Sequence, residues 1–200
     1  GADFSVSIVL GMDAHGNRWI VDIQRQKGRP YSAQKNDILD IGRKYQPDLM
    51  ALESNQMQRI FGDELIRTSD LPIWKYTTTA QGKNSLENGV PSLRVLLENG
   101  KYRLPRGDAR SIEITDQLIT EMASFGYENG KLHALSGHDD LVMGLFLAEQ
   151  ASRRGGFGFD SEEDLKNYDF EKEWESKPEP EIAGEKPASD DGSDLDPFGF

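Results

Sequence analysis

Cysteine is absent from this 200-residue chain, which excludes disulfides, thiolate metal sites and a cysteine nucleophile. No stretch approaches the roughly 18 consecutive apolar residues of a membrane-spanning helix, and no signal-peptide pattern opens the sequence. The phosphate-loop pattern Gly-x-x-x-x-Gly-Lys-Ser/Thr, the Gly-x-Ser-x-Gly elbow and a zinc-type histidine spacing are also missing. We therefore expect a cytoplasmic protein with no membrane partner, no phosphate-loop motor and no acyl-transfer chemistry.

The net charge of −12 is concentrated in the C-terminal part of the chain. From Gly155 onward there are 15 acidic and 4 basic residues, which leaves 20 acidic and 19 basic residues before it. The first part is nearly neutral, so its charge does not argue against a nucleic-acid partner. The last part is acidic, interrupted by proline and too poor in apolar residues to fold alone. We expect a folded domain at residues 1–153 and a disordered acidic tail at residues 154–200, which either solvates the domain or docks through its aromatic residues.

The apolar pattern of the domain predicts a β-hairpin followed by helices that alternate with strands. Residues 4–10 and 18–23 form the two arms of the predicted hairpin, around a turn-like composition at residues 13–17. Further helices are expected at residues 34–45, 55–68, 92–98, 108–125 and 141–151, and further strands at residues 48–52, 71–76 and 102–105. This order implies a mixed sheet with helices on its faces.

Carboxylates stand at the ends of two otherwise apolar stretches. Glu53 closes the predicted strand at residues 48–52, and Asp139 with Asp140 opens the predicted helix at residues 141–151. In an open α/β sheet, strand ends and helix N-termini of this kind meet outside the carboxyl ends of the strands. Converging carboxylates bind Mg²⁺ or Mn²⁺, and two such ions can hydrolyse a phosphodiester. The chain is therefore interpreted first as a metal-dependent phosphodiester-cutting domain.

Each of these residues also has a purely structural interpretation. Asp139 could cap the helix that follows, and Glu53 could be a solvated strand end. The adjacent aspartates favour the functional interpretation, because one can cap while the other faces a ligand. His138 could orient a metal-bound water or a phosphate, or simply pack. Lys83, in a polar loop after a predicted strand, could contact a DNA phosphate or remain solvated.

The order of these motifs resembles the nuclease domain of the large terminase subunit of tailed bacteriophages, over about residues 1–153. The pieces that carry the resemblance are Gly1-Ala2-Asp3-Phe4-Ser5, Ala51-Leu52-Glu53-Ser54-Asn55, Lys83, the stretch from Arg94 to Pro105, and Gly137-His138-Asp139-Asp140-Leu141-Val142-Met143. The last piece is the most specific. The whole set in this order is much stronger than any one piece.

By that resemblance the fold is expected to be α/β and ribonuclease H-like, a mixed sheet with helices on both faces. The implied activity is two-metal endonucleolytic cutting of concatemeric viral double-stranded DNA during genome packaging, with Mg²⁺ or Mn²⁺. The implied site consists of the metal ligands Glu53, Asp139 and Asp140, the auxiliary residues Asp3 and His138, and the DNA contacts Lys83, Arg103 and Arg106. The implied partners are a motor ATPase domain, the small terminase subunit and the capsid portal. The implied location is the host cytoplasm, transiently at the procapsid.

One departure from the family's pattern bears on activity. The family's first catalytic aspartate lies on a strand upstream of the segment that begins here with Gly1, and Asp3 matches only a secondary acidic position. The resemblance therefore implies a fragment that lacks the first acid and the first central strand, and that alone cuts DNA poorly or not at all. The alternatives are another ribonuclease H-like nuclease, of the resolvase or transposase type, and a non-catalytic module that clamps DNA or docks on a portal.

Overall fold

The structure is a computed structural model that describes residues 4–54, 57–128 and 131–155. In chain order its elements are β1 (Phe4–Met12), β2 (Arg18–Lys27), α1 (Tyr31–Tyr45), β3 (Met50–Glu53), α2 (Met57–Thr68), β4 (Ile73–Tyr76), α3 (Ala80–Asn84), α4 (Val90–Glu98), β5 (Tyr102–Arg103), α5 (Ala109–Ser124), β6 (Phe125–Glu128), β7 (Lys131–Ala134) and α6 (Asp140–Gly155). Among the described helices, none has the length and apolar character needed to cross a membrane. The predicted acidic tail lies outside the described residues beyond the end of α6.

The predicted hairpin is confirmed. β1 pairs antiparallel with β2 along its length, with a bulge after Val9. Asp13 closes the turn, because its carboxylate accepts hydrogen bonds from the backbone N–H groups of His15 and Asn17, each at 2.9 Å. The start of β2 also pairs in parallel with β5, which gives a three-stranded sheet in the order β1-β2-β5.

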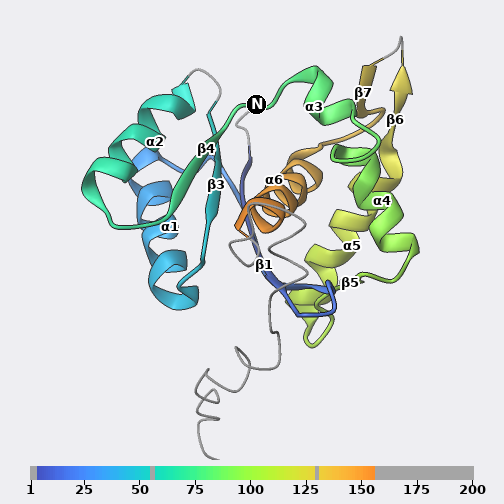
Figure 1. Cartoon of the computed structure of the whole chain (residues 1–200), viewed down its shortest axis with the longest axis horizontal. Coiled ribbons are helices and arrows are strands. Elements are labelled where there is room, and N and C mark those ends of the chain that lie inside the picture. The colour runs from blue at the N-terminus through green and yellow to red at the C-terminus, as the bar shows by residue number, and fades with distance from the viewer. Residues whose placement is uncertain (1–3, 55–56, 129–130, 156–200) are drawn as a thin grey trace, which may run out of the picture. The chain divides into compact units, whose positions relative to one another are not determined.

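β3 and β4 form a second, parallel pair with helices on both of its faces. A methyl group added at Gly62 of α2 would lie 3.3 Å from Leu52, and one added at Gly155 of α6 would lie 3.0 Å from Leu49. Side chains of an extended segment alternate between faces, so Leu49 and Leu52 point in opposite directions. α2 therefore covers one face of this pair and α6 covers the other (Figure 1).

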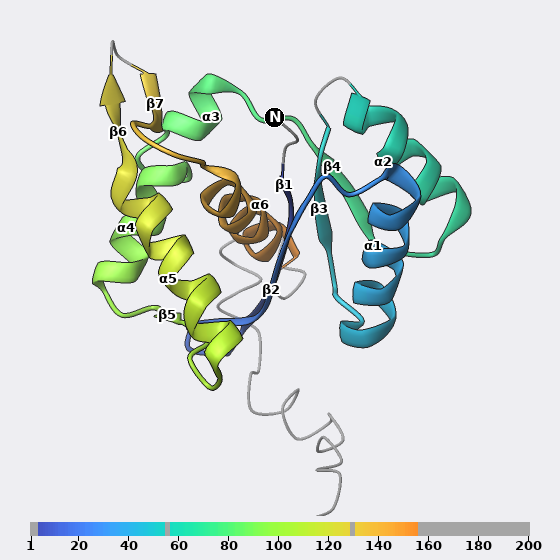
Figure 2. The ribbon, with the colours of Figure 1, turned by 180° about the vertical axis from the view of Figure 1, so that it is seen from behind.

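Helix α6 packs against both sheets. Its residue Gly144 lies against Val6 and Ile8 of β1, whereas Gly155 lies against the segment that enters β3. β1 and β3 are each the outermost strand of their own sheet, and α6 spans the pair of them (Figures 1 and 2). The predicted mixed α/β architecture is confirmed, with the described strands divided among three small sheets.

The core forms around α6, which packs against the hairpin, α4 and α5. The most deeply buried apolar side chains of α6 are Leu141, Val142, Leu145 and Phe146. They join a cluster that includes Ile20, Ile23, Val90, Leu93, Tyr102, Leu118 and Leu132. Burying each large aliphatic side chain contributes on the order of 1.5–3 kcal/mol, so the first turns of α6 are firmly anchored.

Two features of the described chain are not among the predicted elements. Helix α3 has only five residues and begins where Thr79 accepts a hydrogen bond from the backbone N–H of Gly82, at 3.1 Å. Such a short helix leaves no periodic pattern in the sequence. The antiparallel pair of β6 and β7 was also missed, although Asn129-Gly130 between alternating residues is a strong hairpin signal. The predicted helix at residues 108–125 is confirmed with Asp108 as its cap, bonded to the backbone N–H of Ser111 at 2.8 Å.

Candidate functional site at the start of helix α6

Two of the predicted acidic residues, Asp139 and Asp140, lie at the start of α6, and a third, Glu53, ends β3. Because the last residue of α6, Gly155, lies against Leu49 just before β3, the helix runs antiparallel to that strand. Its first turn therefore points toward the carboxyl end of β3, where Glu53 stands. Glu53 is the last residue of β3 and therefore lies at that end of the strand.

Asp139 lies directly before α6 and faces a lysine from another element. Its Oδ2 atom lies 3.4 Å from the Nζ of Lys83 on α3, and 39% of the Asp139 side chain is exposed. The Lys83 ammonium also lies over the ring of Phe125, 5.2 Å from its centroid. Lys83, expected in a loop, is thus held on a short helix beside one of the two aspartates.

Asp140 faces two nitrogen groups at longer distances than a tight ion pair. Its Oδ2 atom lies 3.9 Å from Arg25 Nη2 and 3.6 Å from His138 Nδ1, and 28% of its side chain is exposed. Charge-assisted N–H···O bonds normally measure about 2.7–2.9 Å. The His138 side chain is 59% exposed and stands edge-on to the ring of Phe4, with the ring centroids 5.0 Å apart. Both aspartates therefore lie beside cationic groups and remain partly exposed to solvent.

A buried glutamate that the sequence pattern did not single out supports this end of α6. Glu121 of α5 accepts the backbone N–H of Leu141 through Oε2 at 2.8 Å, and its Oε1 lies 2.9 Å from Arg25 Nη2. The second contact is ionic, since no described residue gives Oε1 a well-directed hydrogen bond. Arg25 also donates to Gln117 at 3.0 Å and lies 4.0 Å from the centroid of the Phe4 ring. Arg25 thus connects β1, β2, α5 and the start of α6.

The remaining predicted site residues lie elsewhere or outside the described chain. Arg103 lies on β5, where it donates to the carbonyl of Gly100, and Arg106 pairs with Asp116 at 2.8 Å. β5 pairs with the start of β2, and no described contact brings Arg103 or Arg106 to Lys83. Their role in DNA binding stays a prediction. Asp3 lies outside the described residues.

The described side chains have the right chemistry for a hard cation but not the full number of ligands. Carboxylate oxygens such as those of Asp139 and Asp140 are the donors that Mg²⁺ and Mn²⁺ prefer. Across residues 4–54, 57–128 and 131–155, however, no group of three or more His, Asp or Glu side chains is arranged to hold a metal ion. These residues alone therefore fit part of a metal site.

Comparison with known proteins identifies a family whose model matches this chain. The family model described as "Terminase RNaseH-like domain" matches residues 1–150. The crystal structure of the large terminase nuclease from thermophilic phage G20c aligns with a TM-score of 0.57 and 22% identity, over 75% of this chain and 76% of that chain. The crystal structure of that nuclease with bound cobalt aligns with a TM-score of 0.52 and 18% identity, over 74% of this chain and 81% of that chain. No curated protein matches. These similarities confirm the predicted ribonuclease H-like fold.

Proposed function

This chain belongs to the terminase RNaseH-like domain family, and on that premise we propose that it is a nuclease domain that cuts viral double-stranded DNA during genome packaging with the help of divalent cations. The observation that carries the proposal is the pair of adjacent, partly exposed aspartates, Asp139 and Asp140, at the start of α6, on the side toward the carboxyl end of β3. The cobalt bound to the similar terminase nuclease of phage G20c agrees with divalent-metal use in this fold.

The proposal gives each polar group at this end of α6 a role. Glu53, Asp139 and Asp140 would hold Mg²⁺ or Mn²⁺, two ions in all, and the bound metal would supply Lewis-acid stabilisation of the charge on the phosphodiester. In this proposal Lys83 exchanges its contact with Asp139 for a DNA phosphate, and the exposed His138 helps to orient that phosphate.

The arrangement of the sheets supports a further contribution to the site from outside the described residues. β1 and β3 are the outermost strands of two sheets that α6 bridges, so an extended segment between them would join both sheets into one. An acid carried on that segment would lie near the start of α6 and raise the number of ligands. We infer that the 200 residues alone are a weak nuclease or an inactive one.

The partners in this proposal are double-stranded DNA, a motor ATPase domain, the small terminase subunit and the capsid portal. The reaction takes place in the host cytoplasm, transiently at the procapsid. Membership of a terminase family supports the DNA substrate and the packaging partners, whereas the location in the cell stays a prediction.

Calorimetric titration with Mn²⁺ tests the metal-binding part of the proposal. Glu53→Ala, Asp139→Ala and Asp140→Ala are each expected to weaken Mn²⁺ binding by more than about tenfold, since even residues that only orient metal ligands cost 10- to 100-fold. Glu113→Ala is the matched control, because Glu113 is an exposed carboxylate on α5. If all three variants bind Mn²⁺ like the unaltered chain, the non-catalytic clamp or docking module becomes the better assignment.

A further inference from the structure

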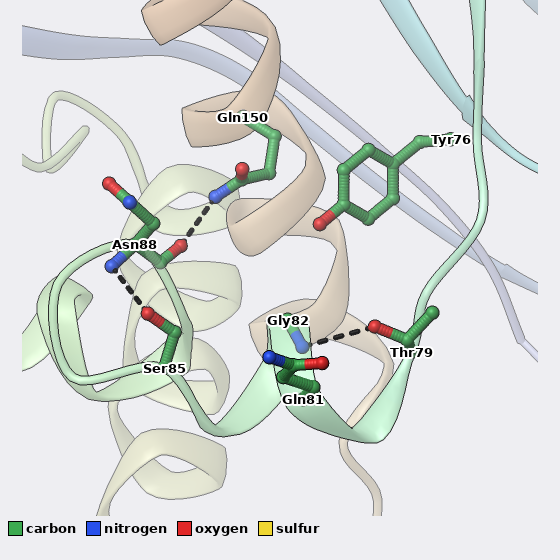
Figure 3. Close-up of a pocket in the computed structure, with 7 residues that line it drawn as sticks. All are labelled: Tyr76, Thr79, Gln81, Gly82, Ser85, Asn88 and Gln150. Atoms are coloured by element: carbon green, nitrogen blue, oxygen red, sulfur yellow. Dashed lines mark hydrogen bonds between the residues drawn. The ribbon is translucent and has the colours of Figure 1, made fainter.

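An open pocket of about 360 Å³ adjoins the candidate site (Figure 3). It is lined by Tyr76, Thr79, Gln81, Gly82, Ser85, Asn88 and Gln150. These residues come from the end of β4, from α3 and the segment that follows it, and from the second half of α6. No charged side chain is among the lining residues; the polar groups are hydroxyls and primary amides.

The pocket is connected to two residues of the candidate site. Tyr76 is the pairing partner of Glu53 in the parallel β3–β4 register. Gly82 directly precedes Lys83, whose ammonium reaches Asp139. A ligand in the pocket would therefore lie next to both the strand that carries Glu53 and the lysine assigned to a phosphate.

Hydrogen bonds within the walls hold the pocket in shape. The side-chain amide of Gln150 donates to the carbonyl of Asn88 at 2.6 Å, and the backbone N–H of Asn88 donates to Ser85 Oγ at 3.2 Å. On the opposite side, the backbone N–H of Gly82 donates to Thr79 Oγ1. Figure 3 shows these bonds on either side of a space that the Tyr76 ring borders. Hydrogen bonds thus connect α6 to the segment after α3 and fix both ends of α3.

Tyr76 supplies an aromatic surface and a donor. Its ring packs edge-on against Trp74 and Phe146, with centroids 5.1 Å and 5.7 Å away. A methyl group at Gly82 would lie 3.5 Å from the Tyr76 hydroxyl, so the absence of a side chain at Gly82 keeps the space beside that hydroxyl open. Burial raises the pKa of Tyr76, which keeps the hydroxyl protonated and able to donate near neutral pH.

The chemistry of the lining selects the class of ligand. No cationic side chain lines the pocket to favour a phosphate or a carboxylate. A nucleobase is flat, stacks on aromatic rings and presents amide-like donors and acceptors along its edge. The volume lies at the small end of the roughly 300–1,000 Å³ range of ligand pockets, which suits one base and not a base pair.

We propose that this pocket binds one unpaired nucleobase of the DNA substrate, adjacent to the phosphate that Lys83 contacts. The inference rests on the proposed function, because it requires DNA at the candidate site. A base inside an intact duplex cannot enter, so the domain must either prefer DNA with an unpaired nucleotide or extrude one from the stack. We therefore expect the domain to cut DNA near mismatches, gaps or frayed positions.

The test compares two short duplexes that differ only in one nucleotide. Both carry one 2-aminopurine, which is paired with thymine in one duplex and lies opposite an abasic site in the other. Binding is measured by fluorescence anisotropy in Ca²⁺ with the full chain. We expect the unpaired duplex to bind roughly tenfold more tightly and its 2-aminopurine fluorescence to change on binding. Tyr76→Leu should remove most of that preference, since base–aromatic stacking is worth about 1–3 kcal/mol per base, or 5- to 150-fold.

Two more variants keep the test decisive. Gln81→Ala changes an exposed residue at the pocket, so it reports on the ligand even if Tyr76→Leu fails to fold, and it should also reduce the preference. Asn36→Ala is the matched control, because it removes an exposed amide from α1. Equal binding of both duplexes, or a preference that survives Gln81→Ala and Tyr76→Leu, overturns the pocket proposal and leaves the nuclease assignment intact. Failure to bind either duplex overturns both, and the Mn²⁺ titration then shows whether metal binding survives.

Discussion

Glu121 of α5 accepts the backbone N–H of Leu141, 20 residues later in the chain, at 2.8 Å. The side chain that satisfies the first turn of α6 therefore comes from a neighbouring helix. Asp139 takes part in the cap only through its backbone carbonyl, which accepts the N–H of Met143 at 2.9 Å, and its carboxylate turns to Lys83. The capping role considered for Asp139 does not use its side chain, so the carboxylate remains directed at a cation.

Glu121→Ala should be among the most destabilising single changes in the domain. It leaves the buried N–H of Leu141 without an acceptor and the guanidinium of Arg25 without its closest carboxylate. Removing one partner of a buried pair costs about 3–5 kcal/mol, to be measured by urea unfolding. Glu113→Ala on the exposed side of α5 is the control and should cost less than about 0.5 kcal/mol. A similar small cost for both variants would show that Glu121 does not anchor α6.

A second buried glutamate, Glu149, makes the stability of the domain sensitive to acid. Its carboxylate accepts hydrogen bonds from Arg18 at 2.9 Å, Arg153 at 2.8 Å and the Tyr102 hydroxyl at 2.7 Å. Burial alone would raise the pKa of Glu149, but these bonds outweigh burial and hold its pKa below the ordinary value. The carboxyl of the unfolded chain has a pKa of about 4.3.

A carboxyl whose pKa is lowered by folding stabilises the folded state above its unfolded pKa, and that stability is lost as the pH falls through the folded pKa. We expect the free energy of unfolding to hold steady between pH 7 and about pH 5 and then to decline below about 4.3. Urea midpoints measured across this range should show the decline, and Glu149→Gln should make it shallower while lowering stability at pH 7. An unchanged acid slope in Glu149→Gln would assign the decline to other carboxylates.

Gly144 sets how closely α6 approaches β1. A methyl group at this position would lie 2.7 Å from Val6 Cγ1, and Val6 is β-branched and cannot easily turn away. Gly144→Val should therefore cost about 1–3 kcal/mol of stability through overpacking, measured by thermal or urea unfolding. Gly107→Ala is the control, since a methyl group there meets no atom within 4 Å. Comparable stability of both variants would mean that α6 can shift on the sheet without cost.

Local pattern was sufficient for most of the elements, although it missed α3 and the β6–β7 pair, and it singled out two acids as candidates. Asp139 and Asp140 were found because an acidic pair before an apolar helical run is visible in adjacent residues. The roles of Glu121 and Arg25 could not be found in that way. Glu121 lies within an amphipathic helix at what reads as a polar position, and only the packing of α5 on α6 shows that it is buried. Contacts between residues 20 or more positions apart depend on tertiary packing. The spacing of apolar residues in the sequence does not predict such contacts.

Lys83→Ala should weaken DNA binding to a similar degree on every sequence. Lys83 is the cation held beside Asp139, and a lysine that contacts one phosphate releases about one counterion. The slope of log K against log salt should therefore fall by about 1. Anisotropy titrations in Ca²⁺ at several salt concentrations measure this slope. Arg94→Ala, which removes an exposed arginine paired with Glu98 on α4, should leave it unchanged. If Lys83→Ala also leaves it unchanged, Lys83 does not contact phosphate.

The division between the two sheets leads to a prediction about activity. α6 lies against both β1 and β3, and the acids at its start lack a complete set of ligands among the described residues. The 200-residue chain in Mn²⁺ should therefore nick supercoiled plasmid at least about a hundredfold more slowly than a longer product that is extended by a strand between β1 and β3. A hundredfold is the scale of losing catalytic geometry. Asp140→Ala in the longer product is the control and should abolish its nicking.

Robust Mn²⁺-dependent nicking by the 200 residues alone would contradict this prediction. If Asp140→Ala then abolished this nicking, the described acids would be sufficient for cutting, together with residues outside the described ranges such as Asp3. Slow nicking that the longer product restores would instead mean that the gap between β1 and β3 is where the missing ligand enters. Because a strand joining the two sheets would also bury the edges of β1 and β3, the longer product should unfold at a higher urea concentration. A gain in activity without that gain in stability would place the missing ligand elsewhere.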